Sequence, residues 1–277
     1  MQSAATSTSS ISGVKGCPIR FARSAVKSNK FHRSGASKEP LFIKGLSMAF
    51  LFAPGPMPVL PIDGEPNLYF PIHRIYGIAK NYSTTKIAPE ERTAPLIFCK
   101  PADAVVYAPG DKTIELDFPC ATKELVHELE LVVAIGKGGQ NIPVEEAMDH
   151  VWGYCVGLDL TRRDLRLKDQ PWEAAKAFDE SAPMTALKPV SRVPDNEPMS
   201  LWLYVNNEKR QEGNSSQMIY SIAEIISHLS SLYELKPGDL IMTGTPAGNT
   251  TFNPGDRLEG GVQGVGVLKV KFTEMIK

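Results

Sequence analysis

Short apolar runs, separated by Gly, Pro, Asn and Asp, recur along the chain from about residue 59 onward. Their length and their content of Val, Ile and Leu predict strands rather than helices. The runs are Ile75–Ala79, Leu96–Cys99, Ala104–Tyr107, 127–135, Trp152–Leu160, Leu201–Val205, Leu240–Met242 and Gly264–Phe272. Asn206-Asn207 predicts a hairpin turn from 201–205 into a further strand at 208–212.

Helical patterns are fewer. Residues 144–150 predict a short helix behind Pro143, because proline is favoured at a helix start. Residues 222–232 place apolar side chains at the spacing of one helical face, and Ser221 is suited to cap that helix. Strands therefore dominate, and the pattern predicts an α+β domain rather than a doubly wound sheet.

The first 40 residues differ in composition from the rest. They contain seven Lys or Arg and no acidic residue before Glu39, with frequent Ser and Thr. This composition predicts a mitochondrial transit peptide. The alternatives are a disordered basic tail, or an extension upstream of a start at Met48, in which case the protein is cytoplasmic. We divide the chain into the basic extension 1–47, an extended Pro-rich lead-in 48–71 and a folded domain 72–277.

The composition and net charge of the chain indicate which classes of partner to expect. The formal net charge is −1 and hydrophobic residues make up 42% of the chain, which is the composition of an ordinary soluble globular protein. Neither nucleic acid nor a membrane surface is indicated as a partner. No run of apolar residues is long enough to span a bilayer. No two cysteines have C-x-x-C spacing, so a structural zinc site is not indicated.

Glu128 and Glu130 lie in the strand-like run 127–135. Because side chains of a strand alternate between two faces, both carboxylates project to one side, about 6 to 7 Å apart at the backbone. Two such charges beside an apolar run need a counter-charge or a shared proton. A divalent cation meets that need. The alternative is that both glutamates lie on a solvent-exposed face.

Asp159 ends a second apolar run and is costly to bury without a partner. It could pair with Arg162 or Arg163, or it could supply a third oxygen ligand beside the two glutamates. Three carboxylates without cysteine favour a hard cation such as Mg²⁺, Mn²⁺ or Ca²⁺ over zinc.

Two further segments could take part in this chemistry. Lys176 is either a surface charge or, near a metal, a group that binds a carboxylate or stabilises negative charge. Residues 238–248 run from a strand into a loop of small residues. Such a loop lets backbone N–H groups approach an anion, although a plain strand-turn is the alternative.

Taken in order, these motifs resemble the fumarylacetoacetate hydrolase superfamily, and most of all its acylpyruvase and oxaloacetate decarboxylase branch. The resemblance spans about residues 72–272. The motifs that carry it are 80–82, 100–101, 127–131, 157–164, 171–178, 208–213 and 240–246.

The resemblance implies a mixed β-roll with a few short helices, a homodimer, and a small-molecule 2-oxo acid as substrate. It further implies one Mg²⁺ or Mn²⁺ held by Glu128, Glu130 and Asp159. The catalytic lysine of the family falls on Lys176. Its substrate-binding positions fall on Lys80, Arg163 and Thr245.

One departure concerns the family's His–Glu dyad, which activates water from a short lid. Counting from Asn81-Tyr82 places Thr85 and Ala88 at those positions, and neither residue is a general base near neutral pH. Glu90 or Glu91 could replace the dyad from a reshaped lid. A second departure is Arg166, at the position of a glutamine in the family.

We therefore expect a divalent-metal-dependent hydrolase or lyase acting on an acylpyruvate or on oxaloacetate, with hydrolysis weakened. Decarboxylation of oxaloacetate, its tautomerisation, or isomerisation of a 2-oxo diacid would survive the loss of the dyad better, because these reactions need no activated water. A catalytically silent metabolite-binding protein is the alternative from another functional class.

Overall fold

Two β-sheets that share one hydrophobic core carry most of the secondary structure. The computed structural model describes residues 51–194 and 198–273. All elements below belong to the unit Pro56–Lys277. The predicted extension 1–47 lies outside the described residues, and the division at residues 47 and 71 remains a prediction.

The larger sheet is mixed and has eight strands. Its strand order is β4-β3-β15-β8-β9-β11-β5, and β12 pairs with β9. The strand bounds are β3 (Ile75–Ala79), β4 (Leu96–Lys100), β5 (Val105–Tyr107), β8 (Leu129–Ile135), β9 (Val151–Leu158), β11 (Ala182–Met184), β12 (Lys188–Pro189) and β15 (Leu240–Met242). β8 and β9 pair antiparallel in the middle, whereas β15 runs parallel to β3.

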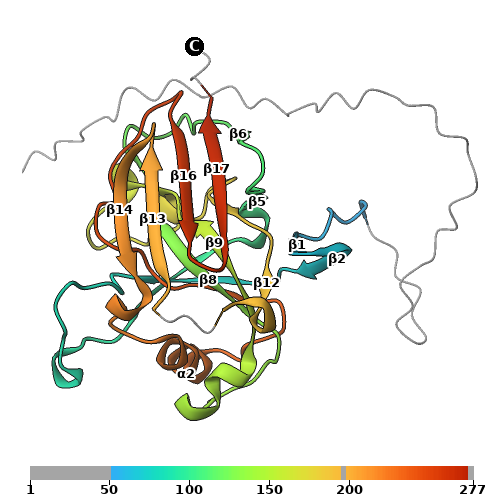
Figure 1. Ribbon diagram of the computed structural model, residues 1–277, viewed down its shortest axis with the longest axis vertical. Coiled ribbons are helices and arrows are strands. Elements are labelled where there is room, and N and C mark those ends of the chain that lie inside the picture. The colour runs from blue at the N-terminus through green and yellow to red at the C-terminus, as the bar shows by residue number, and fades with distance from the viewer. Residues whose placement is uncertain (1–50, 195–197, 274–277) are drawn as a thin grey trace, which may run out of the picture. The chain divides into compact units, whose positions relative to one another are not determined.

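The second sheet has five strands in the order β14-β13-β16-β17-β6. Its strands are β6 (Ile114–Leu116), β13 (Ser200–Val205), β14 (Glu208–Asn214), β16 (Arg257–Val262) and β17 (Gly266–Phe272). β14, β13, β16 and β17 stand side by side in Figure 1, with β8 and β9 next to them. Asn206 and Asn207 both have positive φ, which confirms the predicted hairpin turn between β13 and β14.

Two smaller strand pairs complete the sheets. β1 (Val59–Ile62) and β2 (Glu65–Pro71) form an antiparallel hairpin within the segment that we expected to be an extended lead-in. Gly64, with φ +72°, makes its turn, and Leu60 and Phe70 bury against the larger sheet. β7 (Leu125–Val126) pairs antiparallel with β10 (Thr161–Arg162).

Helices are short, as the sequence predicted. α2 (Ile222–Leu232) begins with a capping box in which Ser221 and Glu224 bond reciprocally to each other's backbone. The remaining helices are α1 (Glu173–Lys176) and the 3₁₀ helices η1 (Pro89–Glu91), η2 (Ala102–Ala104), η3 (Val144–His150), η4 (Arg163–Leu165), η5 (Val190–Arg192) and η6 (Ser215–Gln217). The predicted helix at 144–150 is thus a 3₁₀ helix. The strand-dominated α+β fold is confirmed.

The alternation of side chains along β8 separates two hydrophobic clusters. Every residue of β8 is buried. Leu131, Val133 and Ile135 enter the core shared with the five-stranded sheet, whereas Val132 and Ala134 face the opposite cluster, where the β1–β2 hairpin packs. Because the period of a strand is two, Glu130 belongs to the same face as Val132. The core on one side therefore fixes which way the carboxylates point.

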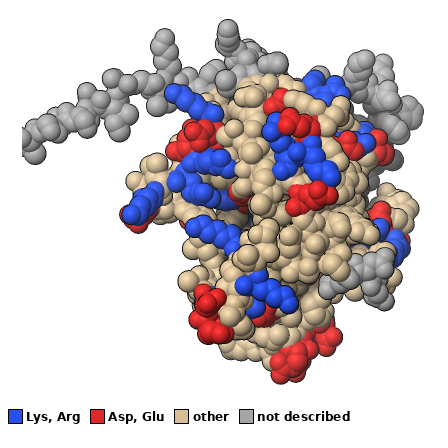
Figure 2. All heavy atoms as spheres, turned by 60° about the vertical axis from the view of Figure 1, so that its left-hand side comes forward, with Lys and Arg blue, Asp and Glu red and all other residues tan. Residues whose placement is uncertain are grey.

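The surface of the described residues carries mixed charge. Lys and Arg side chains lie interspersed with Asp and Glu on the face drawn in Figure 2. Within the described residues, no helix is long and apolar enough to cross a membrane.

The capping box of α2 predicts a measurable loss of stability. We expect Ser221→Ala to lower the free energy of unfolding by about 1 kcal/mol, because the backbone N–H of Glu224 loses its acceptor. Urea unfolding measures the change. Ser231→Ala, which removes only an exposed bond to the His228 carbonyl, is the control and should stay within about 0.5 kcal/mol. Equal effects of the two variants would contradict the capping role.

Candidate metal and substrate site

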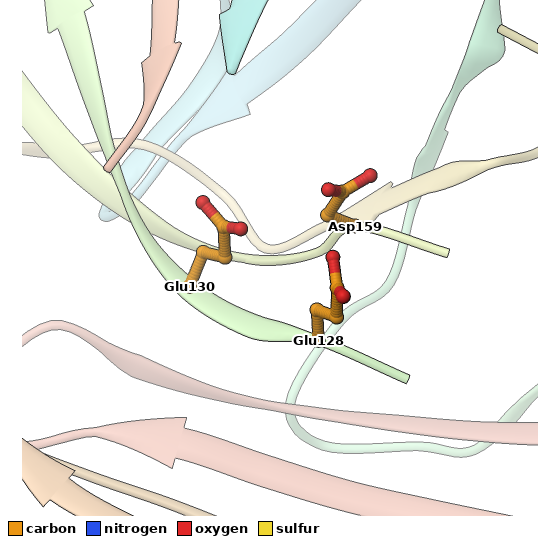
Figure 3. Close-up of side chains that lie close together, drawn as sticks. All are labelled: Glu128, Glu130 and Asp159. Carbon is orange, nitrogen blue, oxygen red and sulfur yellow. The ribbon is translucent and has the colours of Figure 1, made fainter. Parts of the chain in front are cut away.

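Three carboxylates converge at one end of the β8–β9 pair. Glu128 lies in the two-residue link between β7 and β8, Glu130 is the second residue of β8, and Asp159 directly follows β9. In Figure 3 their side chains point toward one another, and one ligand oxygen from each lies within 4.8 Å of the others. Strand register brings them together, because the Asp159 N–H donates to the Glu128 carbonyl at 2.8 Å.

All three carboxylates are buried. The exposed fractions are 8% for Glu128, 2% for Glu130 and 0% for Asp159. The alternative of a solvent-exposed glutamate pair is therefore wrong. Buried carboxylates need partners, since moving an unpaired charge out of water costs on the order of several kcal/mol.

Lys176 supplies one partner and is no surface charge, since only 2% of it is exposed. Its Nζ donates to Glu128 Oε2 at 2.6 Å, to Thr161 Oγ1 at 2.7 Å and to Asp159 Oδ2. The side chain reaches the carboxylates from the last residue of α1. Asp159 thus pairs with a lysine rather than with Arg162 or Arg163.

Lys100 is a second buried lysine, to which the sequence analysis assigned no role at the site. Its Nζ lies 2.9 Å from Asp159 Oδ1. Its three protons are donated to the carbonyl oxygens of Leu160, Lys176 and Ser181, at 3.2, 2.6 and 3.0 Å. Among the described residues, the contact of Asp159 Oδ1 is therefore the ion pair with Lys100.

The protonation tendencies of the acids follow from these contacts. Burial raises the pKa of Glu130 well above its ordinary value, and the charges of Asp159 and Glu128 raise it further. Burial also raises the pKa of Glu128, against the opposing effect of Lys176. Burial would raise the pKa of Asp159 as well, but the two ammonium groups outweigh it and lower that pKa.

The two lysines differ for the same reasons. Burial opposes the charge of Lys176, yet Asp159 and Glu128 outweigh it and raise the pKa of the lysine. For Lys100, burial dominates and lowers the pKa despite the attraction of Asp159. Lys176 is therefore the more firmly protonated of the two.

This donor set fits a hard divalent cation. With all groups ionised, three carboxylates and two ammonium groups leave one net negative charge in a buried cluster. Glu128, Glu130 and Asp159 each offer a carboxylate oxygen, the kind of ligand that Mg²⁺ and Mn²⁺ prefer. The three carboxylates could thus hold one divalent ion.

The cluster lines a cavity of about 300 Å³. Lys80 and Thr245 also line it, so these two predicted residues lie beside the carboxylates. Arg166 lines the cavity, whereas Arg163 is not part of its wall and donates instead to the Asn249 carbonyl at 3.3 Å. The substrate-binding roles of all three predicted residues remain predictions.

The loop after β15 supports the glutamates. The N–H of Gly244, at φ +97°, donates to Glu130 Oε2 at 2.7 Å. Asn249 Nδ2 donates to Glu128 Oε1 at 2.9 Å. The small-residue loop thus does approach an anion, as one alternative predicted, and that anion is a carboxylate of the protein. The Thr245 hydroxyl donates to the Leu129 carbonyl at 2.7 Å, so that proton is already committed.

Asn249 carried no recognisable sequence signal, because an isolated amide after a Gly-rich loop is common. Gln211 lies in the motif 208–213, but no role at the site was predicted for it, because a polar side chain in a strand usually faces solvent. Its Oε1 accepts from the Leu129 N–H at 3.1 Å and its Nε2 donates to Thr245 Oγ1 at 2.8 Å. This one side chain from β14 therefore joins the strand that bears the glutamates to the loop that supports them.

The positions expected for the dyad lie elsewhere. Thr85 and Ala88 line a neighbouring cavity, and Glu91 lines another. Among the described residues that line the cavity at the carboxylates there is no histidine, and no acid besides the three already named. The wall thus offers no separate general base for water.

Comparison with known proteins identifies relatives of this chain. Residues 74–273 match the family model described as fumarylacetoacetate (FAA) hydrolase C-terminal. The mitochondrial oxaloacetate tautomerase of Mus musculus is 43% identical over 181 residues, which cover 64% of this chain and 80% of the relative. The mitochondrial oxaloacetate decarboxylase of Dictyostelium discoideum is 33% identical over 198 residues, which cover 69% and 89%.

A solved structure of a related enzyme is also similar to this chain. The crystal structure of fumarylpyruvate hydrolase from Pseudomonas aeruginosa, in complex with Mn²⁺ and pyruvate, is similar with a TM-score of 0.77 and 44% sequence identity. The similarity covers 82% of this chain and 100% of that chain.

The charge balance of the cluster predicts that Glu130→Gln affects metal binding without lowering the stability of the metal-free protein. A folded-state pKa above the ordinary value means that ionising Glu130 near neutral pH costs stability. We therefore expect the metal-free variant to melt at the temperature of the unsubstituted protein or above it. The variant should also lose the rise in melting temperature that Mn²⁺ gives the unsubstituted protein, which is worth about 2.7 kcal/mol at a hundred times Kd.

Differential scanning calorimetry with and without Mn²⁺ measures both quantities. Glu115→Gln is the control, since Glu115 is an exposed acid paired with Lys271 at 2.8 Å. It should keep the full response to Mn²⁺. A retained Mn²⁺ response in the Glu130 variant would contradict the site.

Proposed function

The chain belongs to the fumarylacetoacetate hydrolase family, and from this premise we propose that it is a divalent-metal-dependent enzyme acting on a small 2-oxo acid of the oxaloacetate type. We propose that it favours enolisation chemistry, namely tautomerisation or decarboxylation, over hydrolysis of acylpyruvates. Mg²⁺ or Mn²⁺ would be the ion.

The observation that carries the proposal is the contact of the Lys176 ammonium with Glu128 and Asp159, in a cavity whose described wall has no separate base for water. An acid–base group is thus present at the carboxylates, and the group that hydrolysis would need is not among the lining residues. Proton transfer to and from carbon requires the first and not the second.

The cavity provides the groups that such a reaction needs. Glu128, Glu130 and Asp159 would hold the divalent ion, which when bound polarises the 2-oxo group and favours its enolate. Lys176 is protonated, so it can deliver a proton to carbon 3 of an enol or enolate. The centre of the Phe98 ring lies 4.5 Å from Lys176 Nζ, so the ring covers one side of that ammonium group.

The two reactions balance with Lys176 alone as proton carrier. In conversion of enol to ketone, the ammonium protonates carbon 3 and the amine takes the proton of the enol hydroxyl. In decarboxylation, the bond from carbon 3 to the leaving carboxyl breaks, its electron pair forms the enolate, and the ammonium protonates carbon 3. The amine of Lys176 then takes up a proton from the solvent.

The names of the relatives support this choice. One relative is an oxaloacetate tautomerase and another an oxaloacetate decarboxylase, and both names specify mitochondrial proteins. Together with the basic, acid-poor composition of residues 1–47, this supports a mitochondrial location for this protein. A homodimer, as the resemblance implies, is part of the same proposal.

Replacing the proton carrier tests the enzymatic role. We expect Lys176→Met to lower turnover of oxaloacetate by about 10²–10⁴, the usual contribution of a positioned acid or base, while Mn²⁺ still raises the melting temperature. A stopped-flow assay of enol absorbance measures the rate. Lys137→Met, at an exposed lysine away from the cavity, is the control and should retain full activity. Unchanged turnover in the Lys176 variant would favour a silent binding protein.

The lining of the cavity predicts the substrate preference. We expect the unsubstituted protein to turn over oxaloacetate at least about 100-fold faster than it hydrolyses acetylpyruvate, because hydrolysis lacks its general base. Comparable kcat/KM for the two substrates in the unsubstituted protein would contradict the preference.

A further inference from the structure

We propose that Arg166 binds a second carboxylate of the substrate, so that the protein selects 2-oxo acids with a distal carboxylate over those that end in an uncharged group. This inference rests on the proposed function, whose 2-oxo acid it specifies further. No role for Arg166 follows from the metal cluster itself.

Arg166 stands at the cavity in a defined position. It is the residue that ends η4, and its backbone N–H donates to the Arg163 carbonyl at 3.1 Å. Its guanidinium carbon lies 5.4 Å from the centre of the Trp172 ring. Trp172 in turn packs on Phe98, with ring centres 6.2 Å apart, and Phe98 lines the same cavity. Two rings, with planes tilted by 46° to each other, therefore connect the guanidinium to the wall.

Stacking on an aromatic ring uses the face of a guanidinium and leaves the N–H groups of its edge available. Among the described residues, the contact found for the Arg166 side chain is the one with the Trp172 ring, and neither a hydrogen bond nor an ion pair accompanies it. Arg162 and Arg163 do not line the cavity, and Arg163 donates to the Asn249 carbonyl. Arg166 is thus the arginine of this segment that can bind an anion in the cavity.

The charges that line the cavity favour a substrate with a second carboxylate. With all groups ionised, the buried cluster carries one net negative charge, and a divalent ion would change it to one net positive charge. The 2-oxo carboxylate of a bound substrate neutralises that charge. A second carboxylate would then need its own cation, and Lys80 and Arg166 are the remaining cationic residues among those that line the cavity.

Arg166 is better suited than Lys80 to discriminate between substrates. A guanidinium edge can donate two parallel hydrogen bonds to one carboxylate, whereas an ammonium acts as a point charge. Both side chains are exposed, but Lys80 lies on the link after β3 without an aromatic ring beside its side chain among the contacts described, whereas Arg166 lies over the Trp172 ring. We therefore assign the selection of a distal carboxylate to Arg166.

A pair of stable ligands of equal chain length tests this assignment. 2-Oxoglutarate has a distal carboxylate and 2-oxovalerate has a methyl group in its place. Their Kd values for the Mn²⁺-loaded full-length protein are measured by isothermal titration calorimetry. We expect Arg166→Gln to weaken 2-oxoglutarate about tenfold to a hundredfold, the usual effect of losing a charge-assisted hydrogen bond, and to change 2-oxovalerate less than threefold. Arg166→Lys should fall between.

Lys168→Gln is the matched control. Lys168 lies two residues after Arg166 and carries the same charge, but its side chain is exposed and does not line the cavity. It should leave both Kd values unchanged. Equal weakening of both ligands by Arg166→Gln, or the same loss in the Lys168 variant, would overturn the inference. Because binding is measured, it can fail while oxaloacetate turnover persists, and it can hold if turnover is lacking.

Discussion

Charge balance in a buried cluster is the constraint on which the rest of this site depends. Three carboxylates lie within reach of one another beneath the surface, and two ammonium groups only partly compensate them. Two like charges about 4 Å apart repel by about 4 kcal/mol even at a moderate effective dielectric. The fold supports this arrangement through the Gly244 N–H, the Asn249 amide and two buried lysines. A divalent cation would complete the balance.

The sheets explain why the cluster forms where it does. The alternation of β8 sends its odd-numbered residues into the shared core, which leaves the even-numbered positions, Glu130 among them, on the other face. Antiparallel register with β9 then places Asp159 opposite Glu128. The same packing that stabilises the domain therefore orients the ligands, and Gln211 couples that strand to the supporting loop.

The spacing of apolar and polar residues along the chain predicted the features that depend on residues close together in sequence. The period of two placed both glutamates on one face, and the helical spacing behind Ser221 predicted α2. Other features depend on tertiary contacts. The bonds of Lys100 to three carbonyl oxygens could not be inferred from an isolated lysine in a strand. The strand Arg257–Val262 was missed because Gly260 and Gly261 interrupt its apolar pattern, and the β1–β2 hairpin because prolines favoured an extended lead-in.

The central claim is that a single hard ion is held by Glu128, Glu130 and Asp159. Anomalous diffraction from crystals soaked in Mn²⁺ tests it most directly, because it locates the ion without reference to activity. The account predicts one anomalous peak coordinated by an oxygen of each carboxylate. A peak bound elsewhere, or none at these three residues, would contradict it.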